Sequence, residues 1–422
     1  MLATAESFRT IVGLAALSGW IAWRYSRLPV SQDEGLWMLW GFTGARPYID
    51  QVDCKPPGIH LWCWVLARTT GFNPYACRLL QQLALGAIAI TAYCLSGNVS
   101  AALCFIIVAQ SAWFQGYFAW VEATSAGLWF LAFFCAPSVA MAFLVLAWLF
   151  NLKLVLPTIV FALLRGWFAE VAVALFLVAL AALVLHFVAP TLARALWYGC
   201  VIVPKRLVQM RARNARRTLP QLDAKLLVPL LIIVALAISA AMHGFDASAW
   251  GAAAVYLGVN AAGRVWRPYH WIPLAPVLAF AALPIALTIV VVDLVTNGLY
   301  LGDIVARQRP VVSRYLKAAQ KIGNEIFGNA GRLWVYGQFT QLYIYARARP
   351  ALLPVEQVEI RHVIPERREQ TGTVEQVDTL VICPGEIRFL PEDFRPTVIE
   401  DGFMVLKRTR DSTEAPQCHS PT

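Results

Sequence analysis

The sequence has few charged residues and none of the short motifs that mark many soluble enzymes. Only 14% of its 422 residues are charged. It contains no Cys-x-x-Cys pair, no G-x-x-x-x-G-K-[ST] loop and no strand-linked G-x-G-x-x-G loop. These absences argue against a zinc site built on cysteine pairs and, more weakly, against an activity driven by ATP or NAD. Among the nine cysteines, only a disulfide between Cys54 and Cys77 stays open.

Apolar residues dominate instead. They make up 59% of the chain, which includes 16 tryptophans, and this is far above the content of a soluble domain. A membrane-spanning helix needs about 20 apolar residues. We therefore expect an α-helical polytopic membrane protein with about 11 spans. The candidate spans are 8–28, 78–96, 99–118, 120–136, 138–152, 154–165, 167–189, 190–204, 226–243, 246–262 and 269–295.

Basic residues are unevenly distributed along the chain. Residues 1–310 contain 21 Lys and Arg against 11 Asp and Glu, whereas residues 311–422 contain 14 basic and 14 acidic residues. The excess lies at the ends of apolar runs and not on a folded basic domain, which argues against a nucleic-acid partner and for membrane orientation. The run 205–217 has six basic residues and no acidic one, so it is predicted to be cytoplasmic.

Counting spans away from this basic run predicts the topology. The N-terminus falls in the cytoplasm, residues 30–77 form the first extracytoplasmic loop, and the C-terminal region is extracytoplasmic. Within the loop, residues 58–71 are too short to cross the bilayer and are expected to form an interfacial helix. The same count places Arg264, Arg267, Tyr269 and His270 on the cytoplasmic side, away from that loop.

The C-terminal region is expected to fold separately from the transmembrane domain of residues 1–310. Residues 311–410 read as a small extracytoplasmic α/β domain, and residues 411–422 as a disordered tail. Helices are predicted over 311–326 and 338–347, and strands over 332–337, 377–383 and 402–408.

The stretch SQDEGLWMLWGFTGARPYIDQVDCKPPGIH (31–60) concentrates charge in the first loop. A carboxylate there can accept a proton from an acceptor or bind a divalent cation, and a lysine can stabilise a departing phosphate. Two prolines, Pro56 and Pro57, fix the start of the following helix. Such residues also occur in loops that are merely solvated. The loop carboxylates are Asp33, Glu34, Asp50 and Asp53, and the lysine is Lys55.

The order DEG, RPYID and DCKPPGIH, followed by Arg78 at the start of the next span, resembles the first outer loop of GT-C membrane glycosyltransferases. Within this superfamily the chain resembles the branch of protein O-mannosyltransferases and the lipid A aminoarabinose transferase. The stretches WVEATSAGLW, LAWLFNLKLVLP and RPYHWIPLAP, and the C-terminal region, are similar to later parts of these proteins. The resemblance covers nearly the whole chain. Gly58 departs from it, because a leucine is more usual there.

The resemblance implies a site and a donor. The donor would be a sugar linked to a polyprenyl phosphate such as undecaprenyl phosphate, and the site would lie in the first loop. Asp33 would be the general base, Glu34 would contact the acceptor or a metal, and Lys55 would bind the lipid phosphate. Further residues implied are Lys153 for phosphate, and Asp50, Asp53, His60 and Glu122 for substrate.

Several of these residues have other interpretations. Glu122 can cap a helix, Lys153 can extend to the membrane surface, and His60 can contact lipid headgroups. Whether the carboxylates hold Mg²⁺ or Mn²⁺ is left open.

The prediction is an inverting glycosyltransferase of the bacterial inner membrane. It would act on a lipid, glycan or protein acceptor at the outer face. The alternative is a non-enzymatic carrier or flippase for a lipid-linked glycan, which should place charges near the middle of its spans.

Overall fold

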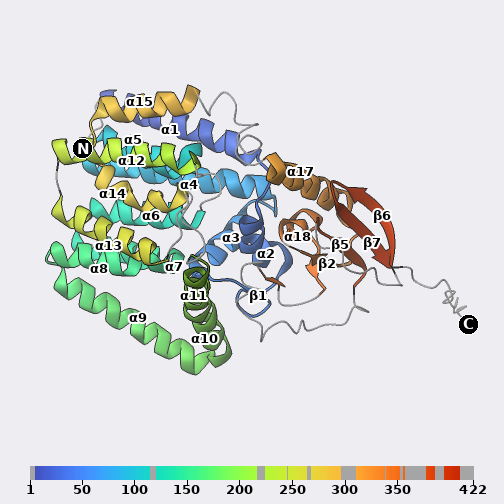
Figure 1. Cartoon of the computed structure of the whole chain (residues 1–422). Helices are drawn as coiled ribbons and strands as arrows, with labels where there is room; N and C mark the ends of the chain where they lie inside the picture. Colours follow the sequence, from blue (N-terminus) through green and yellow to red (C-terminus); the bar gives the residue numbers. More distant parts are fainter. Residues whose placement is uncertain are drawn as a thin grey trace, which may run out of the picture.

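The fold is given by a computed structural model of the chain. It describes residues 5–114, 120–215, 224–244, 246–263, 268–295, 310–337, 339–351, 355–356, 377–384 and 394–408. A bundle of apolar helices forms one part, and a small α/β part follows it (Figure 1).

Antiparallel helices make up the bundle (Figure 1). Asn73 and Asn98 cap the starts of two of these helices by accepting backbone N–H bonds. The bundle helices are α1 (Ala5–Ser26), α4 (Pro74–Ser96), α5 (Val99–Gln110), α6 (Trp120–Phe133), α7 (Pro137–Phe150), α8 (Val155–Leu164), α9 (Phe168–Val188), α12 (Ala224–His243), α13 (Ala247–Gly263) and α15 (Leu283–Asp293).

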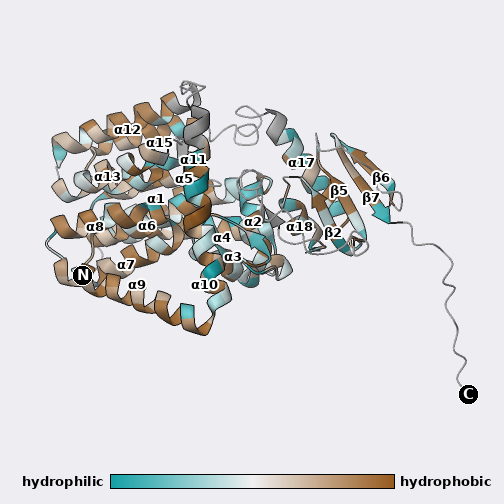
Figure 2. Ribbon diagram, turned by 60° about the horizontal axis from the view of Figure 1, so that its bottom comes forward, coloured by the Kyte–Doolittle hydropathy of each residue, from teal (hydrophilic) through white to brown (hydrophobic). Residues whose placement is uncertain are grey.

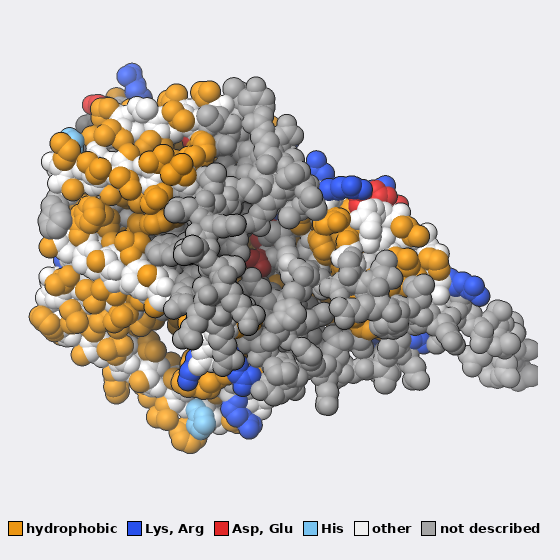
Figure 3. Space-filling view, in the orientation of Figure 1, with side chains coloured by type: hydrophobic (Ala, Val, Ile, Leu, Met, Phe, Trp, Pro, Cys, Tyr) orange, Lys and Arg blue, Asp and Glu red, His pale blue; other side chains and the backbone are white. Residues whose placement is uncertain are grey.

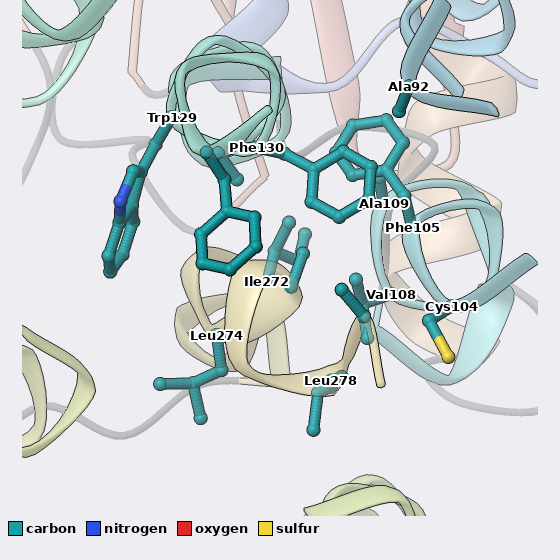
Figure 4. Close-up of a cluster of buried hydrophobic side chains, with 14 of the residues drawn as sticks. Ala92, Cys104, Phe105, Val108, Ala109, Trp129, Phe130, Ile272, Leu274 and Leu278 are labelled. Carbon is teal, nitrogen blue, oxygen red and sulfur yellow. The ribbon is translucent and has the colours of Figure 1, made fainter. Parts of the chain in front are cut away.

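Aromatic packing fills the centre of the bundle. Phe105 of α5 stacks on Phe130 of α6 with 5.1 Å between ring centroids. Ile272 and Leu278, from the two short helices η4 (Pro268–Leu274) and α14 (Ala275–Leu278), belong to the same buried cluster as these rings (Figure 4). In lipid such close packing, and not the hydrophobic effect, holds helices together.

The outer surface of the bundle is strongly apolar. Phe176 and Phe187 on α9 are 65% and 75% exposed. Hydrophobic residues make up most of the bundle helices (Figure 2), and hydrophobic side chains are widespread on the face of the bundle shown in Figure 3. Two described helices, Pro74–Ser96 and Phe168–Val188, are both long and apolar enough to cross a bilayer. So large an apolar surface is stable when it faces lipid, so the chain is a membrane protein.

Two predicted spans differ from the structure. The run 190–204 does not cross the bundle. It belongs to a rod formed by α10 (Pro190–Trp197), the π-helical turn η3 (Tyr198–Ile202) and α11 (Val203–Ala215). This rod lies against the first loop. The run 269–295 is divided, because the chain breaks after α14 and starts α15 at Leu283, where the Ala282 amide donates to Ser239 Oγ at 2.8 Å.

The basic run therefore lies where the charge count did not place it. Val203 and Leu207 of α11 pack on Cys54 and Tyr198. This end of the bundle, which carries residues 30–77, is called the loop end below. The prediction that the basic run lies opposite the loop is wrong, because 190–204 makes no pass. The side of the membrane that the loop end faces stays a prediction.

The α/β part has five strands in the order β3-β2-β5-β7-β6. Strand β2 pairs in parallel with β3 and β5, and β7 pairs antiparallel with β5 and β6. The predicted helices and strands are all found here. Sequence reasoning missed the two edge strands of this sheet, β3 and β6, each of which carries a proline, a residue that is tolerated at a sheet edge. The elements are α17 (Pro310–Glu325), β2 (Arg332–Tyr336), α18 (Gln341–Ala346), β3 (Arg349–Pro350), β5 (Thr379–Ile382), β6 (Phe394–Glu400) and β7 (Phe403–Arg408).

This α/β part shares a hydrophobic core with the first loop. Leu342 and Ile344 of α18 pack in one cluster with Leu36 and Trp37 of the loop. Strand β1 (Gln51–Val52) of the loop also pairs in parallel with β4 (Val355–Glu356). The two regions are therefore joined by packing, although the charge balance alone had suggested a separate domain.

Candidate functional site

The first loop contains two helices, α2 (Gln32–Thr43) and α3 (Pro57–Thr69). Ser31 caps α2 in a capping box. Its Oγ accepts the Glu34 N–H at 3.3 Å, and its own N–H donates to Glu34 Oε2 at 2.7 Å. Asp33 lies in the first turn of α2, where the helix dipole stabilises a carboxylate.

Contacts from the α/β part fix the start of α2. The Thr340 hydroxyl donates to the Gln32 carbonyl at 2.7 Å, and the Val30 amide donates to the Tyr345 hydroxyl at 2.6 Å. Gly35 lies so close to α18 that a Cβ there would be 2.5 Å from the Gln341 nitrogen. The backbone around Asp33 is therefore held from both sides.

Glu34 forms a buried ion pair. Its side chain is fully buried, and Arg78 of α4 donates through Nε to Oε1 at 2.8 Å and through Nη2 to Oε2. Arg78 also donates to the Pro29 carbonyl at 3.0 Å. These contacts tie the end of α1 to α4. They favour a structural role for Glu34 over the predicted contact with acceptor or metal.

Lys55 connects the loop to the bundle. Its Nζ lies 3.3 Å from Glu122 Oε1, at the start of α6, and the lysine side chain keeps 29% of its exposure. Tyr48 donates its hydroxyl to the Lys55 carbonyl at 2.5 Å. The predicted loop lysine and the predicted helix-start acid are thus brought together.

The charges around Lys55 raise its pKa. Desolvation by burial acts to lower this pKa, but Glu122, Cys54, Tyr269 and Asp33 raise it in that order, and the net direction is upward. Lys55 is therefore a cation at neutral pH. Asp33 lies close enough for its charge to act on this ammonium group.

Tyr269 is also part of this cluster, which contradicts its predicted position. The span count placed it on the side opposite the loop, but η4 carries it to the loop end beside Lys55. The count failed because it treated 190–204 as a span. His270 is buried, and its ring centroid lies 4.7 Å from that of Tyr269. Arg264 and Arg267 lie outside the described residues.

Asp53 and His60 form a buried network behind Lys55. They are 0% and 1% exposed, and His60 Nε2 lies 3.1 Å from Asp53 Oδ2. Asp53 Oδ1 accepts the N–H groups of Cys54 at 2.6 Å and Lys55 at 3.1 Å, and Gln51 Nε2 lies 3.0 Å from His60 Nδ1. This geometry favours positioning of the Lys55 backbone over the predicted direct contact with substrate.

Asp50 pairs with Arg46 across one turn. Arg46 Nε donates to Oδ2 at 2.9 Å, Nη2 donates to Oδ1 at 3.1 Å, and the Arg46 amide donates to Oδ2 at 2.8 Å. Burial acts to raise the pKa of Asp50, but these bonds and the arginine charge outweigh it and lower the pKa. The substrate role of Asp50 stays a prediction.

Gly58 is explained by the packing of α3. A Cβ at this position would lie 2.5 Å from the backbone oxygen of Leu149 at the end of α7. Because only glycine permits this approach, the departure from the usual leucine has a local cause in this chain.

Lys153 lies in η2 (Leu152–Leu154), between α7 and α8, and contacts α13. Its Nζ donates to Asn260 Oδ1 at 3.1 Å. Tyr256 lies one turn earlier on α13, beside Asn260 and within electrostatic range of Lys55 and Glu122. Sequence reasoning missed Tyr256 and Asn260. The available signal was a pair of polar residues four apart in an otherwise apolar helix.

Three of the four loop carboxylates face different partners. Glu34 faces Arg78, Asp50 faces Arg46, and Asp53 faces His60. Within the described ranges, no group of three His, Cys, Asp or Glu side chains could hold a metal ion. Whether the protein uses Mg²⁺ or Mn²⁺ stays an open prediction.

The disulfide considered between Cys54 and Cys77 is not formed. Neither cysteine takes part in a disulfide. Cys77 Sγ lies 3.2 Å from the Thr70 hydroxyl, and Cys54 packs against Val203 of α11.

Comparison with known proteins finds two similar solved structures. One is the crystal structure of ArnT from Cupriavidus metallidurans bound to undecaprenyl phosphate, with 14% identity, a TM-score of 0.49, and coverage of 98% of this chain and 100% of that one. The other is ArnT from the same organism in the apo state, with 15% identity, a TM-score of 0.41, and coverage of 94% and 96%. Both likenesses are distant. No protein-family model matches the chain, and no curated protein matches it significantly.

Proposed function

We propose that this membrane protein is a glycosyltransferase that moves a sugar from a polyprenyl-phosphate donor to an acceptor at its loop end. One observation carries the proposal. The Lys55 ammonium is held by Glu122 with the Asp33 carboxylate nearby, at the boundary between the apolar bundle and the polar loop. A lipid-linked phosphate can place its chain along apolar helices and its anionic head beside Lys55.

Asp33 and Lys55 act on opposite sides of the sugar in this proposal. The acceptor hydroxyl or amine gives its proton to Asp33 and attacks the anomeric carbon. The bond from that carbon to the phosphate oxygen breaks as the new glycosidic bond forms. The electron pair leaves with polyprenyl phosphate, whose charge Lys55 neutralises. In-line attack inverts the anomeric configuration.

Glu122 and the buried Asp53–His60 network hold Lys55 in position as a cation for this role. Glu122 maintains the lysine as a cation and holds its side chain at the bundle. Asp53 fixes the backbone from which the lysine projects. Because the ammonium group is already in position before the donor binds, less free energy is needed to reorganise the site around the leaving group.

The alternative of a carrier or flippase fits the charge distribution less well. A carrier is expected to have ionisable groups near the middle of its spans. The described ion pairs of the bundle lie at helix ends, as in Lys55–Glu122 at the loop end and Arg165–Asp246 at the opposite end.

Sugar release from radiolabelled undecaprenyl-phosphate sugars tests the proposal. We would compare the purified protein in detergent with Asp33→Asn, with and without chelator. We expect Asp33→Asn to lower turnover by roughly 10²- to 10⁴-fold, because general base catalysis is lost.

Asp401→Asn is the matched control, because it removes a carboxylate that pairs with Arg314 in the α/β part, away from the first loop. It should reduce turnover far less. Equal turnover in wild type and Asp33→Asn would refute the assigned base. No turnover with any lipid-linked donor would favour the carrier.

A further inference from the structure

The rod formed by α10, η3 and α11 has two different faces. Its inner face packs on the first loop, where Val203 is buried against Cys54 and a Cβ at Gly199 would lie 2.8 Å from the Asp53 backbone oxygen. The outer face recurs every three or four residues, which is the spacing of one side of a helix. The exposed side chains of this face are Arg194, Trp197, Val201, Lys205 and Val208.

The outer face combines positive charge with apolar surface. Residues 190–217 contain seven Lys and Arg and no Asp or Glu. Trp197 is 62% exposed, and it lies between the exposed Arg194 and Lys205 along the rod. In Figure 3, Lys and Arg side chains gather at the end of the rod where the hydrophobic surface of α9 stops. A ligand of this face therefore has to offer both an anionic group and apolar contact.

The rod lies at the level where the apolar surface of the bundle ends. It begins directly after α9, whose last residues, Phe187 and Val188, are strongly exposed and apolar. Figure 2 shows α11 running across the direction of the bundle helices at the loop end. Because the bundle helices cross the bilayer, a helix that runs across them at this boundary lies along the membrane surface.

We propose that the outer face of the rod binds the headgroups of anionic phospholipids in the surrounding bilayer. Arg194 and Lys205 contact the phosphate groups, as basic residues of interfacial helices do. Trp197 lies at headgroup level, and Val201 and Val208 contact the start of the acyl chains. This surface is separate from Lys55, which the inner face of the rod adjoins through the contact of Cys200 Sγ with the Lys55 carbonyl at 3.7 Å.

Two other occupants match the outer face less well. A soluble polyanion would pair with the basic residues but would leave Trp197 and the two valines in contact with water. A second copy of the chain in a two-fold contact would bring this face against itself. Because the rod has no acidic residue, the charges of the two copies would repel each other. An anionic lipid satisfies both the charge and the apolar surface.

Titration with phosphatidylglycerol tests the proposal on the full chain in micelles of neutral detergent. Bound lipid is counted by native mass spectrometry, and phosphatidylcholine with the same acyl chains is the neutral reference. The double variant Arg194→Gln, Lys205→Gln should raise the apparent Kd for phosphatidylglycerol about 25-fold, because each basic residue near an anionic lipid surface contributes about fivefold. Its binding of phosphatidylcholine should stay unchanged. Added salt should weaken the binding of phosphatidylglycerol to wild type.

A matched double variant controls for the loss of charge. Arg395→Gln, Lys407→Gln removes two exposed basic residues from paired positions of β6 and β7. It should leave the binding of both lipids unchanged. Trp197→Gln tests the apolar contribution and should weaken the binding of both lipids. In all three variants the Tm without lipid should stay close to that of wild type, since each change is made at an exposed side chain.

Four results would overturn the inference. The first is a wild type that does not prefer phosphatidylglycerol to phosphatidylcholine. The second is equal binding of phosphatidylglycerol by wild type and the rod double variant, or an equal loss in the β6 and β7 control. The third is binding that falls in Lys55→Met and not in the rod variant, which would place the lipid at the proposed donor site. The fourth is displacement of the lipid by inorganic polyphosphate with no effect of Trp197→Gln, which would indicate a soluble polyanion. None of these measurements depends on sugar transfer, so the inference stands or falls separately from the proposed function.

Discussion

The first loop and helix α13 contribute to one cluster in opposite ways. The loop is rich in charged residues, but protein partners engage Glu34, Asp50 and Asp53 closely. Helix α13 carries two polar side chains, Tyr256 and Asn260, in an apolar segment, and Asn260 accepts a hydrogen bond from Lys153. A charged residue in the sequence can therefore already be paired within the protein and not be free to bind a ligand. A rare polar group within an apolar helix is the stronger signal of a site.

Among the variants that test this comparison, a substitution of Lys55 is expected to have the largest effect on turnover. Lys55→Met should lower turnover by about 10²- to 10³-fold, because the leaving phosphate loses its cation. The same change leaves Glu122 without its partner. Because the Glu122 side chain is only 5% exposed, leaving its charge unpaired should lower the free energy of unfolding by roughly 3 kcal/mol.

A double variant separates these two effects. Adding Glu122→Gln to Lys55→Met removes the uncompensated charge and should restore the Tm but not the turnover. Turnover is measured by sugar release and the Tm by thermal unfolding, on the same preparations. Recovery of turnover in the double variant would contradict a role for Lys55 in phosphate stabilisation.

Glu34→Gln is expected to affect stability more than chemistry. It leaves the Arg78 guanidinium buried without its carboxylate, which costs roughly 3–5 kcal/mol of unfolding free energy. Turnover per folded molecule should remain within a few-fold of wild type. A loss of turnover at unchanged Tm would instead support the contact with acceptor or metal that the resemblance implies.

Much of the fold could be predicted from local pattern. Apolar runs predicted the bundle helices, the helix α3, and the helices and three of the strands of the α/β part. The charge count failed at 190–204, because a run of 15 residues with two prolines and an arginine can lie along the loop as well as cross the bilayer. The local sequence does not determine whether such a run lies along the loop or crosses the bilayer.

Part of the site could be predicted as well. Asp33, Lys55 and Glu122 are distant in sequence, and the structure brings their charges together. The buried state of Asp53 and His60 could not be predicted, because it depends on the packing of residues far along the chain. Tyr269 was misplaced by the same error in the span count, and Tyr256 and Asn260 were hidden in an apolar run.

Gly58→Ala should have a moderate effect that is confined to the loop. The added Cβ meets the Leu149 backbone oxygen at 2.5 Å, so α3 must shift at a cost of about 1–3 kcal/mol. We expect a lower Tm and weaker binding of polyprenyl phosphate, since the Lys55 turn precedes this helix directly. Gly71→Ala is unsuitable as a control because its φ is positive. Gly13→Ala on α1 meets open space, so it should leave binding unchanged, and it should not lower the Tm because alanine favours a helix over glycine.

The smallest effect concerns pH, where no change is expected. The pKa of Lys55 is raised in the folded protein, so its ion pair is fully formed below the ordinary lysine pKa of about 10.4 and is lost only above the raised value. Binding of polyprenyl phosphate should therefore stay constant between pH 7 and about 9 once the phosphate is fully ionised. A decrease in affinity across this range in wild type that disappears in Lys55→Met would show that the lysine titrates there, and that the surrounding carboxylates do not hold it as a cation.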